Sequence, residues 1–178
     1  MSFTGALGIA YGAAGVGAGL DLTLVDKQTH AFLETDVDLR ARGAVEISSL
    51  SNEDYASLAT NAGAGQSVGI AGSAAIYGLT NSTLAAVRSS SSDPSVVDAD
   101  GAVTISSTGN LELNGLGLSA GAGGTAGIGA GNVTLSRDDS VQAWIGQDAI
   151  VNSRSGVGLT VQAISTEQLV GVSAAAGA

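Results

Sequence analysis

The 178-residue chain contains no cysteine, one proline (Pro94) and one histidine (His30). Without cysteine, neither a disulfide framework nor thiol chemistry is available. A Ser-His-Asp catalytic arrangement would have to use His30, and one histidine without cysteine cannot supply a structural zinc site. We therefore predict a protein that is not an enzyme and has no catalytic residue, metal site or cofactor.

Aromatic and basic residues are also scarce: aromatics make up 3% of the chain, and 6 Lys and Arg face 16 Asp and Glu. The resulting net charge of −10 argues against binding to nucleic acid or anionic lipid, which needs a basic surface.

Met1–Leu20 is uncharged, but its alternation of small and larger residues is not that of a spanning helix, and it lacks the basic start of a signal peptide. We expect no membrane insertion of this segment, and a secretion signal outside it.

Glycine, in contrast, is abundant, with 27 residues. Each glycine inside a helix costs about 1 kcal/mol relative to alanine, so an ordinary helical domain is disfavoured. Val, Leu and Ile recur throughout the chain, which argues against a disordered linker. Both features favour a thin, tightly turning β structure in which backbone approaches backbone.

Glycine- and alanine-rich alternating runs occur three times, at Gly8–Leu24, Ala62–Leu79 and Gly115–Leu135. Two further motifs recur between them. The first comprises Thr29–Leu33, Thr83–Val87 and Val141–Ile145, and the second comprises Gly43–Ser49, Gly101–Ser107 and Val157–Ala163. Both motifs repeat at intervals of 54 to 58 residues, as expected of a solenoid.

The apolar residues within each unit alternate with period two, which is typical of β-strands. Val16, Leu20 and Leu24 fall on one face, whereas Leu7 and Ile9 follow the opposite phase. This phase slip inside a glycine run indicates a corner or bulge. We predict about five short strands per unit, arranged as two or three coils.

The units differ in length at one place. The second unit inserts Ser89–Pro94 between its two anchor motifs, which is how a β-helix accommodates a loop. No change of composition divides the chain, so we predict one repetitive domain over residues 1–178. Its units are roughly 7–61, 62–114 and 115–170, and 171–178 has the pattern of a fourth unit, as expected of a piece of a longer array.

The order of these motifs resembles the large repetitive bacterial surface adhesins of the filamentous-haemagglutinin-like and leukotoxin-like kind, exported by two-partner or autotransporter routes. The shared pattern is a Gly/Ala alternation, then T-x-A-x-(L/V/I), then G-A-V-x-I-S-S, and it covers nearly the whole chain. The resemblance implies a right-handed parallel β-helix and an extracellular or cell-surface location. It also implies roles in adhesion, aggregation or biofilm, through host-cell or matrix glycans and proteins or through self-association.

Carboxylate pairs are the alternative candidates for chemistry. Asp36/Asp38, Asp98/Asp100, Asp138/Asp139 and Asp21/Asp26 could bind Ca²⁺ with backbone carbonyls, or they could be solvated acids at turns. Arg40 and Arg42 lie beside the first pair, as in a carbohydrate-cleaving solenoid, but alternating charges are more often an outward strand face.

The candidate binding residues are Phe32 and Trp144, which occupy equivalent positions, with Ala86 the third. If Ala31 and Ala143 face inward, these aromatic rings face outward and can stack on sugars or on a neighbouring filament; otherwise they fill the core.

The sequence thus predicts an all-β, right-handed parallel β-helix of three units, serving as a structural and adhesive shaft. A carbohydrate-binding or carbohydrate-cleaving β-helix is the alternative.

Overall fold

The computed structural model describes residues 2–9, 12–154, 156 and 158–178; Tyr11 of the first glycine-rich run and Val157 of the second motif lie outside these ranges. The described residues form ten parallel strands. The strands are β1 (Ser2–Ile9), β2 (Ala14–Leu33), β3 (Asp38–Ala41), β4 (Val45–Gly65), β5 (Val68–Val87), β6 (Val96–Ala99), β7 (Val103–Gly123), β8 (Ala126–Ile145), β9 (Ile150–Ser153) and β10 (Leu159–Gly177).

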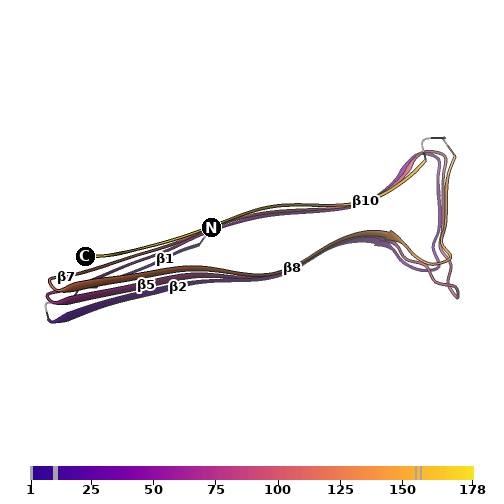
Figure 1. Cartoon of the computed structure of the whole chain (residues 1–178). Coiled ribbons are helices and arrows are strands. Elements are labelled where there is room, and N and C mark those ends of the chain that lie inside the picture. Colours follow the sequence, from indigo (N-terminus) through magenta and orange to yellow (C-terminus); the bar gives the residue numbers. More distant parts are fainter. Residues whose placement is uncertain (1, 10–11, 155, 157) are drawn as a thin grey trace.

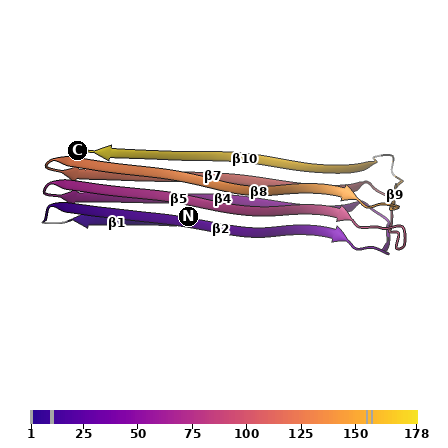
Figure 2. The ribbon, with the colours of Figure 1, turned by 60° about the horizontal axis from the view of Figure 1, so that its bottom comes forward.

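The strands build three sheets, and the chain visits them in a fixed order (Figures 1 and 2). Sheet A has the order β1-β4-β7-β10, sheet B the order β2-β5-β8, and the short sheet C the order β3-β6-β9. Sheets A and B join at the glycine-rich runs, and sheet C joins their other ends (Figure 1). The protein is therefore a parallel β-helix, as the repeats predicted.

Each sequence repeat makes one coil, so the expectation of five short strands in two or three coils per repeat is wrong. A coil has three strands, and two of them are about 20 residues long, as β5 and β7 show. Alternating polar residues in these strands looked like turns in the sequence. They are instead side chains on the face that points to solvent, and the strand continues through them.

The predicted equivalences between repeats are confirmed by the hydrogen-bonded register. Ala31 lies beside Ala85, which lies beside Ala143, and Val45, Val103 and Leu159 are neighbours in sheet A. The Ser89–Pro94 insertion falls in the turn between β5 and β6, where the other two coils have only residues 34–37 and 146–149. The largest variation in length therefore falls at one corner of the solenoid.

The predicted corner is also confirmed. Ile9 pairs with Ala64 and Ala14 pairs with Val68, so the first corner has one residue more than the second. Because side chains alternate between faces, one extra residue reverses the phase of all that follows. The phase slip in the first glycine-rich run therefore marks the turn between sheets A and B.

Close contact between sheets A and B at this corner requires glycine. Gly15, Gly69 and Gly127 form a row that points inward from sheet B. A Cβ atom at Gly69 would overlap the carbonyl oxygen of Ala122 in sheet A, and one at Gly15 would overlap that of Ala64. Sheets carrying ordinary side chains pack about 10 Å apart, and only glycine lets backbone meet backbone more closely.

Larger side chains fill the interior farther from the corner. A middle cluster contains Tyr77 and Leu79 from β5 with Leu111 and Leu113 from β7, all at most 4% exposed. A second cluster lies where sheet C joins the other two sheets, and it contains Ile47, Ala85, Val87, Val97, Ala99, Val103 and Ile105. The interior therefore changes from bare backbone at the glycine corner to a conventional apolar core at the opposite end.

This arrangement predicts opposite effects for two neighbouring glycines. Gly69→Ala should lower the free energy of unfolding by about 1–3 kcal/mol, because the added methyl group forces the sheets apart. Gly72→Ala is the matched control: its Cβ would point outward, with its nearest neighbour, the Ala130 carbonyl oxygen, 4.0 Å away. We expect it to be neutral or mildly stabilising. Denaturant unfolding followed by circular dichroism measures both, and equal effects would contradict the proposed contact between sheets.

Candidate functional site

The aromatic pair predicted from the sequence lies on the outer face of sheet B. Ala31, Leu33, Ala143 and Ile145 pack against the core cluster beside sheet C. Alternation therefore directs Phe32 and Trp144 outward, in one row with Ala86 between them. The two rings come from the first and third coils, and the small Ala86 side chain separates them.

The two rings differ in how available they are. The guanidinium carbon of Arg88 lies 3.6 Å from the centre of the Phe32 ring, and Arg88 also pairs with Glu34 at 3.2 Å. This cation–π contact covers one face of Phe32. Trp144 is 37% exposed. Of the two candidates, Trp144 is therefore the better placed to stack on a sugar ring.

His30 lies on the same outer face, two residues before Phe32. Its Nε2 atom is 3.1 Å from the Ser82 hydroxyl oxygen of the next coil. In the sheet, its equivalents are Leu84 and Gln142, as the repeats predicted. The His30–Ser82 pair lies on an exposed strand face, and none of the grooves or cavities described below includes either residue.

The carboxylate pairs do not assemble into a shared site. Asp38 receives two hydrogen bonds of 3.0 Å from Arg40, which lower the pKa of Asp38. Asp98 and Asp100 both pair with Arg154 of the following coil. These acids are neutralised by arginines on the surface, in the manner of an ordinary outward strand face.

The remaining two pairs are split between the faces of sheet B. Asp139 faces the interior, whereas Asp138 faces solvent, and Asp21 is buried while Asp26 is exposed. Ser57 donates a hydrogen bond to Asp21 across the interior. In the described part of the chain, no group of three or more His, Cys, Asp or Glu side chains is suited to a metal ion.

An interior polar network was not predicted from the sequence. Lys27 of β2 points inward and pairs with Glu53 of β4, which also accepts hydrogen bonds from Ser51 at 2.7 Å and Tyr55 at 2.8 Å. In the outermost coil, Arg137 pairs with Glu167 between sheets B and A. The available signal was the position of Lys27 four residues before Ala31: if Ala31 faces inward, alternation along the strand places Lys27 inward as well.

This network shifts two pKa values. Burial opposes ionisation of Glu53, but the hydrogen bonds from Lys27, Ser51 and Tyr55 outweigh it and lower the pKa of Glu53. Burial, the hydrogen bond to Glu53, and the charges of Glu53 and Asp139 raise the pKa of Tyr55 to about 12. The adjoining cavity, of about 10 Å³, has room for about one water molecule and none for a substrate.

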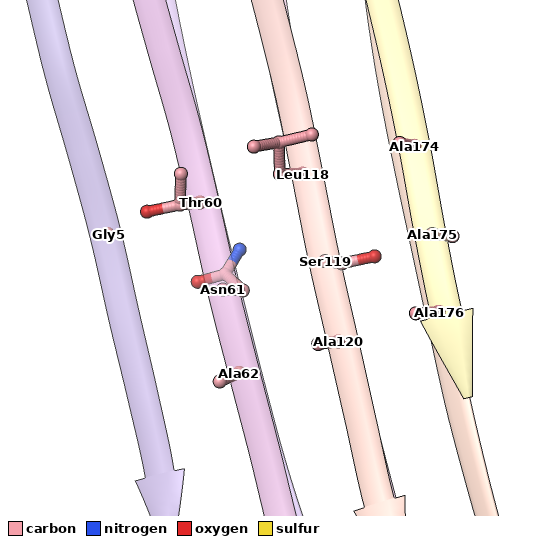
Figure 3. A pocket seen from close by; sticks show the side chains of 10 residues that line it. All are labelled: Gly5, Thr60, Asn61, Ala62, Leu118, Ser119, Ala120, Ala174, Ala175 and Ala176. Atoms are coloured by element: carbon pink, nitrogen blue, oxygen red, sulfur yellow. The ribbon is translucent and has the colours of Figure 1, made fainter. Parts of the chain in front are cut away.

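Described residues of the long sheets line both polar and apolar grooves. A polar groove of about 330 Å³ on sheet A has outward side chains from Asn52, Asp54, Asn110, Glu112, Thr166 and Gln168. Two larger grooves lie near the glycine corner and are apolar. One, of about 720 Å³, crosses sheet A over Ala62, Ala120 and Ala176 (Figure 3), and the other, of about 450 Å³, crosses sheet B over Ala18, Gly72 and Ala130.

The Tyr55 pKa predicts how stability depends on alkaline pH. An unfolded tyrosine titrates near pH 10, so the stability conferred by neutral Tyr55 is complete below about pH 10. It is lost as the pH rises through the folded pKa of about 12. Tyr55→Phe should reduce this alkaline loss, while costing about 1 kcal/mol at neutral pH for the lost hydrogen bond. Denaturant midpoints across this pH range test it, and parallel curves for both proteins would contradict the assignment.

No described helix is long and apolar enough to cross a membrane. No family model matches the chain, and the searches of curated proteins and of solved structures found no match either.

Proposed function

We propose that this chain is a shaft segment of a secreted or surface-anchored bacterial filamentous adhesin, with a structural rather than catalytic role. It would act in cell attachment, aggregation, or formation of biofilm and fibres. The observation that carries this proposal is the continuous register of three successive repeats through all three sheets. The motif resemblance to bacterial surface adhesins supports the extracellular location.

The stacking of coils suits a load-bearing element. Backbone hydrogen bonds between β4 and β7 continue over 21 consecutive residue pairs, so neighbouring coils cannot separate without breaking a long ladder. Side chains extend the same ladder: Ser49 donates to Ser107 at 3.1 Å, and Asn110 donates to Asn52 at 2.7 Å. Many parallel bonds that must break together make the axis resistant to separation.

The shape of each coil adds a second property. A 20-residue strand is about 66 Å long, whereas one coil advances the axis by only about 4.8 Å. The molecule is therefore a broad ribbon rather than a slender rod, and each coil presents two wide outer faces. Such a ribbon offers much surface for contact per unit of axial length, which fits an adhesive role better than that of a simple spacer.

A carbohydrate-binding role is the second candidate, and exposed Trp144 favours it. Aromatic rings on an outer sheet face can stack on the apolar faces of sugars. Cleavage is less well supported, because Asp38, Asp98 and Asp100 are engaged by arginines on an open surface.

Both candidates are tested by one binding experiment. Beads coated with the chain should be retained on some members of a panel of glycans, matrix proteins and host cells. Trp144→Ala should reduce glycan retention severalfold, and Trp144→Phe should restore part of it, because the stacking surface is partly kept. Leu50→Ala, at an exposed side chain in sheet A, is the matched control and should have no effect.

The outcomes separate the candidates. Retention that is insensitive to Trp144 supports adhesion through another surface and rules out this tryptophan as the sugar site. Release of reducing ends from a polysaccharide would show the cleaving alternative, and retention on no surface would refute adhesion.

A further inference from the structure

Large apolar side chains point to solvent on both outer faces next to the glycine corner. On sheet B, one row comprises Val16, Ile70 and Ile128, whose exposed fractions are 64%, 39% and 54%. On sheet A, Leu58, Leu116 and Val172 form a second outward row, in which Leu58 and Leu116 are half-buried and Val172 is 48% exposed. Next to the sheet B row, the inward positions of the same strands hold only glycine or alanine, and the two sheets are too close there to take these side chains.

The charge distribution sets this region apart. We call it the uncharged blade: residues 14–24, 68–78 and 126–136 of sheet B, with residues 2–9, 56–65, 114–123 and 170–177 of sheet A. Asp21, which is buried and points inward, is the only charged residue in these ranges. The net charge of −10 is therefore concentrated toward sheet C, and much of the blade lies beyond the roughly 8–10 Å over which charges act at physiological salt.

Each outer face of the blade carries both a groove and a row of larger side chains. On sheet B, the ridge of Val16, Ile70 and Ile128 borders the groove over Ala18, Gly72 and Ala130. On sheet A, the groove over Ala62, Ala120 and Ala176 has a volume of about 720 Å³ and is also lined by Leu118 (Figure 3), and the row containing Leu116 lies four residues away along each strand. Sheets that pack face to face interdigitate in this way, with ridges entering grooves.

The available area is sufficient for association. Three strands spaced about 4.8 Å apart, over 11 residues of about 3.3 Å each, give each face about 500 Å². Contact between two such faces buries about 1,000 Å² in total, which is the lower limit for a specific interface.

We propose that the uncharged blade is a self-association surface, on which sheet B of one copy packs against sheet A of a second copy of this chain. Because the two faces differ, the contact is heterologous and can propagate from copy to copy, bundling solenoids side by side. This inference rests on the proposed role in aggregation and fibre formation and deepens it, because it names the surface and the occupant.

Analytical ultracentrifugation of the whole chain tests the proposal over a wide concentration range. The wild type should associate reversibly, and Ile70→Lys should weaken association about tenfold or more, because it places a charge in the contact. Leu50→Lys is the matched control, since Leu50 is an exposed apolar residue of sheet A outside the blade. It should leave association unchanged.

Gly72→Leu separates a fitted contact from general stickiness. A side chain at this position points into open space, so the fold should tolerate it. The change makes the surface more apolar but fills the groove. We expect weaker association; association as tight as that of the wild type, or tighter, would overturn the proposal. Circular dichroism and thermal unfolding confirm that each variant is folded.

Cysteine cross-linking tests which faces meet. The chain has no native cysteine, so mixed Ile70→Cys and Ala120→Cys proteins report only the introduced pair. Oxidation of the mixture should favour the Ile70→Cys–Ala120→Cys heterodimer. Three results would each overturn the proposal. The wild type could be monomeric, or oxidation could link like variants in preference to the mixed pair. Association could also be unaffected by both blade variants, as expected if coils stack through open strand edges. No adhesion readout is involved, so failure here leaves the shaft function to its own test.

Discussion

The contact of backbone with backbone between the two long sheets is the constraint on which the rest of this structure depends. Inward rows such as Gly15–Gly69–Gly127 have no Cβ atoms where sheet A meets sheet B, and the sheets approach more closely than larger side chains would allow. Because the interior there is so thin, it cannot hold a leucine or an isoleucine. In the half of each long strand next to the glycine corner, the smallest residues are therefore buried and the largest are exposed.

At the opposite end of each coil, large apolar side chains are buried, as in most globular proteins. Where sheet C joins the other two sheets, the interior is wide enough for Val87, Val97 and Ile105, which are completely buried. Between the two regimes lie the interior ion pairs Lys27–Glu53 and Arg137–Glu167, where apolar filling gives way to hydrogen-bonded charge. The coil thus changes along its length from a backbone-packed edge, through a middle that combines the Tyr77 cluster with these ion pairs, to an apolar core.

This gradient explains why the surface properties are also divided. Charged residues gather toward sheet C, while the outer faces near the corner are apolar and grooved. The charged margin of such a ribbon favours contact with water, whereas the uncharged blade is available for contact with other surfaces. The exposed Trp144 lies near the charged margin, so sugar stacking and contact between blades would use separate parts of the same coil.

Several features followed from the sequence because they are local or periodic. The repeat of 54 to 58 residues and the equivalence of Ala31, Ala85 and Ala143 depend on spacing and alternation, and the register confirms them. The direction of Trp144 was left open by the sequence, between solvent and the core. The number of coils per repeat did not follow, because a polar residue on the solvent face of a long strand reads like a residue in a turn. The interior partnership of Lys27 with Glu53 was likewise missed, because it joins residues on different sheets.

By itself, then, the sequence determined that the chain is β, repetitive and rich in close backbone approaches, because glycine content and alternation act through local stereochemistry. Only the tertiary structure decided that one repeat is one coil, that Arg88 covers Phe32 and leaves Trp144 exposed, and that large apolar residues face solvent. Alternation separates two faces but does not say which one is buried. That choice depends on the distance between sheets, which is set by residues many positions apart in the chain.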